Sequence, residues 1–180
     1  MLDLQKGATL DLAKEAGKAV TKVRIGAGWD VAEGKSVDLD LWAILKGQAP
    51  CYFNNKTAPG VSLDGDDRTG AGSADGADEN MHIDAAALTT DEVVVAINIY
   101  DAVAKGQFFS DVGRAFIEIV DEETGTKLGQ YNITVEGGQN SALVAGKLTK
   151  AADGSLSFTA TGEFSAKGIE TLVAENGGTV

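Results

Sequence analysis

The residues best suited to chemistry are acidic side chains concentrated in one glycine-rich segment, residues 64–79. This segment holds six acids and one arginine in sixteen residues, so its formal charge is −5. At an effective dielectric constant of about 20, two such charges about 4 Å apart repel by roughly 4 kcal/mol. An ordered segment of this composition needs a counter-charge, which a bound cation would supply.

Calcium is the cation that these residue types favour, because it takes roughly six to eight oxygen ligands in flexible geometry. Zinc and copper prefer imidazole or thiolate, which the segment lacks, whereas magnesium stays open as an ion that keeps more of its water. The spacing is not that of an EF-hand, since Arg68 and Thr69 are fifth and sixth counted from Asp64. The alternative is a solvated acidic loop without a metal.

A second acidic pair, Asp38 and Asp40, lies in the alternating stretch 36–45. Strand side chains repeat every two residues, so both carboxylates should lie on one face. Such a pair is costly in a core and favourable beside a cation. The alternatives are a solvent-facing strand surface and a glycosidase-like pair, for which the chain has few aromatic residues to line a sugar site.

The overall charge restricts the partners. Lys and Arg number 15 against 27 Asp and Glu, which gives a net charge of −12 and disfavours sequence-blind binding of nucleic acid. One cysteine and one histidine exclude an intramolecular disulfide and a Cys/His metal motif. The apolar runs are far shorter than the roughly 20 residues needed to cross a bilayer, and the N-terminus shows no secretory pattern. These observations predict a cytoplasmic protein.

The chain of 180 residues is expected to form one domain, 1–180. Its 23 glycines and two prolines suggest short strands joined by tight turns. We therefore predict a mainly β protein, an antiparallel β-sandwich of seven or eight strands with a few short helices. The expected strands are 20–29, 36–45, 51–54, 93–100, 116–120, 128–133, 142–148 and 156–161, and the expected helical segments are 108–112 and 167–175.

Several segments, in the same order, resemble the TerD family of tellurium-resistance and stress proteins. They span residues 4–164 and are L-Q-K-G at 4–7, L-D-L at 10–12, V-R-I-G-A-G-W-D at 23–30, D-L-D at 38–40, F-N-N at 53–55, G-D-D-R-T-G at 65–70, the acids at 75–79, I-Y-D-A at 99–102 and Q-F-F at 107–109. Three features depart from the family pattern: Asp67 stands where Asn is usual, Ala71 where an acid is common, and the region around Ser73 is longer.

The resemblance implies a cytoplasmic β-sandwich that binds calcium and acts in resistance to tellurite and chemical stress. Its partners would be calcium ions and other proteins of a stress-response assembly, and that assembly could be associated with a membrane. The implied calcium ligands are Asp30, Asp38, Asp40, Asn54, Asp66, Asp67, Thr69, Asp75, Asp78 and Glu79.

Two further functions stay open at this point. One is a metal-dependent enzyme acting on tellurite or a phosphorylated small molecule, and the other is a structural module with a merely solvated acidic loop. We expect a non-enzymatic protein, because oxygen ligands are plentiful and no nucleophile motif accompanies His82. Surface or packing roles are favoured for His82, burial as a small hydrophobic residue for Cys51, and a turn-capping role for Asp101.

Overall fold

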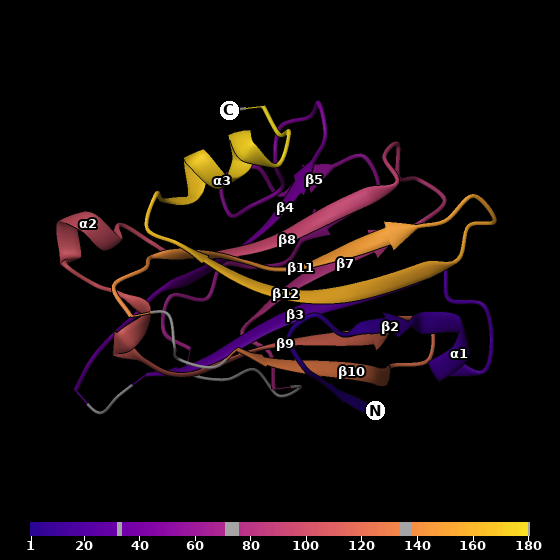
Figure 1. The fold of residues 1–180 in the computed structure, drawn as a ribbon, viewed down its shortest axis with the longest axis horizontal. Helices are drawn as coiled ribbons and strands as arrows, with labels where there is room; N and C mark the ends of the chain where they lie inside the picture. The colour runs from indigo at the N-terminus through magenta and orange to yellow at the C-terminus, as the bar shows by residue number, and fades with distance from the viewer. Residues whose placement is uncertain (32–33, 71–75, 134–137, 180) are drawn as a thin grey trace.

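The computed structural model describes residues 1–31, 34–70, 76–133 and 138–179, which form two β-sheets packed face to face (Figure 1). The seven-stranded sheet has the order β1 (Leu2–Leu4), β10 (Thr126–Ile133), β9 (Val112–Asp121), β3 (Lys22–Val31), β7 (Glu79–Asp84), β6 (Val61–Leu63) and β5 (Thr57–Ala58). The five-stranded sheet has the order β2 (Thr9–Asp11), β12 (Leu156–Ser165), β11 (Ala142–Lys150), β8 (Glu92–Ile99) and β4 (Leu39–Leu45). The predicted β-sandwich is confirmed.

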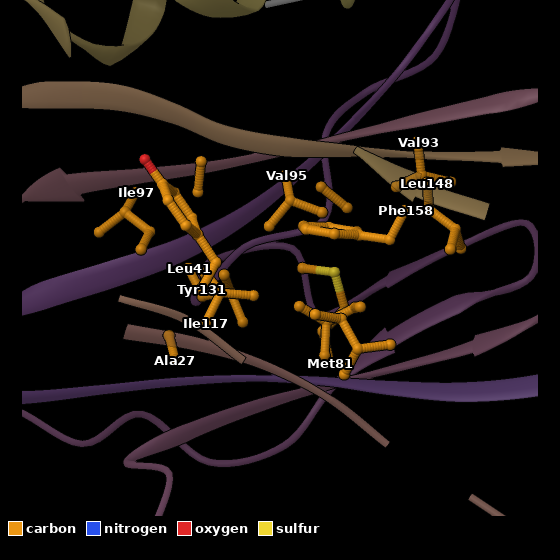
Figure 2. Close-up of a cluster of buried hydrophobic side chains, with 14 of the residues drawn as sticks. Ala27, Leu41, Met81, Val93, Val95, Ile97, Ile117, Tyr131, Leu148 and Phe158 are labelled. Carbon is orange, nitrogen blue, oxygen red and sulfur yellow. The ribbon is translucent and has the colours of Figure 1, made fainter. Parts of the chain in front are cut away.

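The core lies between the two sheets and follows from the two-residue alternation of the strands. In β3, Val23, Ile25 and Trp29 are buried in this core. Figure 2 shows Phe158 and Val95 from the five-stranded sheet facing Met81 from the other sheet. Because these side chains fill the space between the sheets, they fix the relative position of β4 and β7, which carry the acidic residues of interest.

Most strand predictions are confirmed, and the differences have local causes. All paired neighbours are antiparallel except β1 and β10, which are parallel. The predicted strand at 51–54 is wrong. The chain makes isolated bridges there, Ala43 with Cys51 and Tyr52 with Asn55, because it turns back on itself at once. Cys51 is buried as expected, and burial raises the pKa of its thiol to about 11.

Strand β7 was missed because it begins with charged and polar residues. Its burial nevertheless alternates strictly, with Glu79, Met81 and Ile83 turned inward. The glutamate at the first inward position interrupts the alternation of apolar and polar residues that indicates a strand in a sequence. Its placement also brings an acid from residues 64–79 to the interior of the sandwich.

The helices are short. They are α1 (Leu12–Ala16), α2 (Ala102–Lys105), a 3₁₀ turn (Phe109–Asp111) and α3 (Ile169–Glu175), the last two at positions where helical turns were expected. Helix α3 covers the outer face of the five-stranded sheet, where Leu172 and Val173 pack with Trp42 and Ile44 (Figure 1). None of the described helices has the length and apolar character needed to span a membrane. The cytoplasmic location stays a prediction.

Truncating Phe158 tests the central packing. Its side chain is fully buried, so Phe158→Ala should lower the free energy of unfolding by about 3–5 kcal/mol. Val103→Ala is the control, because Val103 is 96% exposed and its change should stay within about 0.5 kcal/mol. Urea unfolding followed by circular dichroism measures both values. Equal losses in the two variants would contradict the core described here.

Candidate cation site

Three aspartates meet at the end of the sandwich that carries α2 (Figure 1). Asp40 belongs to β4, Asp38 directly precedes this strand, and Asp66 lies in the loop after β6. One carboxylate oxygen from each residue lies within 4.8 Å of the others. The chain therefore brings an acid of the glycine-rich segment to the pair whose common face the strand alternation predicted.

Two oxygens of this cluster are buried without a hydrogen-bond partner among the described residues. Asp40 is only 2% exposed, and its Oδ2 has no hydrogen-bond partner among the described residues. The Oδ1 of Asp38 is likewise buried without a partner there. Burial, with the neighbouring charge of Asp38, raises the pKa of Asp40 to about 7. A buried carboxylate oxygen without a partner is costly, and a bound cation would remove that cost.

Glu79 adjoins this cluster from the opposite sheet. It is 1% exposed, and its Oε2 accepts a hydrogen bond from the backbone N–H of Leu41 at 2.7 Å. Burial raises the pKa of Glu79 to about 8, although the Leu41 bond opposes the rise, and the charges of Asp40 and Asp66 add to it. Its Oε1 is buried without a partner among the described residues. Glu79 therefore offers an oxygen while it joins the two sheets.

Asp67, Thr69 and Asp78 are engaged in shaping the loop. The Oδ1 of Asp67 accepts from the backbone N–H groups of Thr69 at 2.7 Å and Gly70 at 3.1 Å, and from the Thr69 hydroxyl at 2.9 Å. The Oδ2 of Asp78 accepts from the backbone N–H of Trp29 at 2.8 Å. Asp67 and Asp78 line a second, more open hollow together with Asp66. They lie beside the three-aspartate cluster without forming part of it.

The remaining predicted ligands lie elsewhere. Asp30 is exposed, and its Oδ2 is 3.5 Å from the Arg114 Nε. Strand alternation explains this position, since the preceding Trp29 points into the core. Asn54 is exposed in a turn, and Asp75 lies outside the described residues. The structure thus does not bring Asp30 or Asn54 to the cluster.

Two glycines of β3 allow the end of the acidic segment to pack closely against this strand. A Cβ atom on Gly26 would lie 2.7 Å from the Ala77 Cβ, and one on Gly28 would lie 2.9 Å from the Gly76 carbonyl oxygen. Larger residues at these positions would push the chain away from β3. Gly26 and Gly28 therefore have a packing role: they let residues 76 and 77, which precede Asp78 and Glu79, lie close against β3.

The cluster opens into a pocket of about 400 Å³ that sequence reasoning did not find. Phe53 and Tyr100 form one wall, with their rings edge to face at 5.5 Å. Tyr100 is held there because its backbone N–H donates to the Asp38 carbonyl at 2.8 Å. The basic side chains of Arg68 and Lys105 also line the pocket. Lys105 follows the acidic segment by many residues, and no spacing rule links the two.

His82 lies outside this pocket, on the outer face of β7. Its Nε2 is 2.9 Å from the Asp64 Oδ2, and its Nδ1 contacts Glu122. Burial alone would lower the pKa of His82, but the hydrogen bonds and charges of the two carboxylates raise it above its usual value. The expectation of a surface or packing role is refined: the imidazole ties the start of the acidic segment to the turn between β9 and β10.

This pairing makes stability depend on pH. Because the pKa of His82 is raised on folding, its contribution is complete below about pH 6.5 and disappears as the pH rises through the folded pKa. His82→Gln should therefore lower the free energy of unfolding more at pH 6 than at pH 9. Urea unfolding at both pH values measures the difference. A loss that does not change with pH would contradict a charged His82.

Comparison with known proteins shows which family and which relatives this chain is similar to. The TerD domain family matches residues 1–175. Tellurium resistance protein TerD of Serratia marcescens is 30% identical, with 98% of this chain and 97% of that protein covered. General stress protein 16U of Bacillus subtilis is 31% identical with the same coverage. A crystal structure of a homologue of telluride resistance protein (TerD) from Streptomyces coelicolor A3(2) covers 89% of this chain and 99% of its own, with a TM-score of 0.70 and 18% identity.

Proposed function

Because this chain belongs to the TerD family of tellurium-resistance and stress-response proteins, we propose that it is a calcium-binding, non-enzymatic β-sandwich protein of such a response. One observation carries the proposal: the cluster of Asp38, Asp40 and Asp66 contains buried carboxylate oxygens without partners among the described residues. Glu79, from the opposite sheet, adjoins the cluster with a further such oxygen.

The chemistry of the donor set fits calcium. All four side chains offer carboxylate oxygens, the ligands that calcium and magnesium prefer. Four carboxylates against Arg68 and Lys105 give −4 + 2 = −2, which one divalent cation balances. Magnesium demands near-ideal octahedral geometry and loses its water reluctantly, whereas calcium accepts irregular sites. Carboxylate ligands that come from two sheets and a loop favour calcium, the ion that tolerates irregular geometry.

A bound ion would act as a structural link. It would join β4 of one sheet to the loop after β6 of the other, at the position where Glu79 already spans the sheets. Binding to the folded state alone would stabilise the protein by about 2.7 kcal/mol at free calcium 100-fold above the dissociation constant. We propose binding rather than catalysis, because the acids described here either have buried oxygens open to a cation or hold the loop through hydrogen bonds. Metal-dependent turnover of tellurite or a phosphorylated compound would support the enzymatic alternative.

Calcium titration of EDTA-treated protein tests the site directly. Wild-type protein should give saturable heat that persists when magnesium competes. The double variant Asp40→Asn/Asp66→Asn should weaken calcium binding at least 100-fold, because it removes two of the three clustered charges. Without calcium, its midpoint of thermal unfolding should be higher than that of the wild type, since repulsion between clustered carboxylates is relieved.

The matched control is Asp3→Asn/Asp91→Asn, which removes two exposed carboxylates outside the site. This control should bind calcium like the wild type. Unchanged affinity in the Asp40/Asp66 variant would show that calcium binds elsewhere. Absence of calcium heat in the wild type, with a thermal midpoint insensitive to EDTA, would leave only a solvated acidic loop.

Calcium binding should also release protons. Asp40 and Glu79 have pKa values raised to about 7 and about 8, and a metal requires the charged carboxylates. At pH 7, binding should therefore release on the order of one proton, and affinity should rise between pH 6 and pH 9. Calorimetry in two buffers with different ionisation enthalpies measures the release. Identical heats in both buffers would place the ion away from Asp40 and Glu79.

A further inference from the structure

We propose that the pocket above the aspartate cluster binds an anionic oxygen group, a phosphate monoester, through Arg68 and Lys105 together with the calcium ion. This inference rests on the proposed calcium site and assigns the ligand class of the adjoining pocket. Asp40 is 2% exposed and lines this pocket, and its Oδ2 has no partner among the described residues. The bottom of the pocket is therefore an oxygen-rich surface that a cation can occupy.

Two basic side chains stand directly beside these acids. The Arg68 Nε donates to the Asp66 Oδ2 at 3.1 Å, and the Arg68 side chain is 76% exposed. The Lys105 Nζ lies 4.9 Å from the centre of the Tyr100 ring, which holds the ammonium group at the pocket. A guanidinium and an ammonium group that converge on one hollow are the usual partners of phosphate oxygens.

The charge balance makes anion binding depend on the cation. The pocket lining carries Asp38, Asp40 and Asp66 against Arg68 and Lys105, a formal sum of −3 + 2 = −1, which repels an anion. One divalent cation changes this sum to +1, or to 0 when the adjoining Glu79 is counted, and in either case removes the repulsion. The ion then attracts the anion, and the two basic groups no longer serve only to offset carboxylates.

Calcium coordination gives a second reason. Calcium takes roughly six to eight oxygens, and a cluster of a few carboxylates leaves positions for water or for an added ligand. The pocket of about 400 Å³ offers room for a small anionic group next to the cluster. The wall of Phe53 and Tyr100 leaves space for an apolar portion of the same molecule.

The competing explanation is that Arg68 and Lys105 only neutralise the acids. In that case their removal would tighten calcium binding, and phosphate would have no effect on it. Coupling between the two ligands separates the explanations, because reciprocal linkage requires an anion that binds beside calcium to raise calcium affinity.

The experiment is a calcium titration with and without ethyl phosphate, a soluble phosphate monoester. In the wild type, ethyl phosphate should raise calcium affinity about fivefold or more. In Arg68→Gln/Lys105→Met, this rise should disappear. Lys6→Met/Lys56→Met removes the same charge from exposed positions outside the pocket and should retain the rise. Thermal unfolding should show that both double variants are folded.

A second arm identifies the source of the anionic group. Calcium-dependent sedimentation with phosphatidic acid vesicles, but not phosphatidylcholine vesicles, and its loss in the Arg68/Lys105 variant would assign a lipid headgroup. An effect of ethyl phosphate without vesicle binding would assign a free phosphate compound. Normal calcium binding that neither probe affects, or effects equal in all variants, would overturn this inference alone. Absence of calcium binding would overturn the proposed function as well.

Discussion

Carboxylates buried at the junction of two sheets are the constraint on which this structure depends. Asp40 and Glu79 come from different sheets, yet both are almost fully buried and both have raised pKa values. A sandwich without a further ligand would be more stable with apolar residues there. Buried acids at this position are therefore the feature on which the proposed binding site rests.

The remainder of the sandwich holds these acids in place. Side chains such as Phe158 and Met81 fill the space between the sheets and prevent the strands from moving apart when like charges repel. The glycines at 26 and 28 allow the chain to return close to β3 before Glu79. The loop is shaped by its own hydrogen bonds, with Asp67 accepting three of them. Rigid sheets thus hold the candidate site, to which a shaped loop adds Asp66.

The sequence predicted the fold class and part of the candidate site, for reasons that individual residues illustrate. The two-residue period of the stretch 36–45 predicted that Asp38 and Asp40 share a face, because that period is a local property of strands. The acidic composition of residues 64–79 marked the loop that supplies Asp66. Tyr100 and Lys105 could not be predicted, since they reach the pocket through the pairing of β8 with β4 and through the last residue of α2. Asp30 lies away from the cluster, because motif membership says nothing about which face of β3 a side chain occupies.

The hydrogen bond from the Leu41 N–H to Glu79 also bears on edge-to-edge association between copies of this protein. β4 is an edge strand, and an edge strand with free backbone groups invites pairing with another chain. On the side away from β8, Glu79 occupies the N–H of Leu41, and Cys51 pairs with both backbone groups of Ala43. A carboxylate at the proposed ion site thus also shields a sheet edge from aggregation.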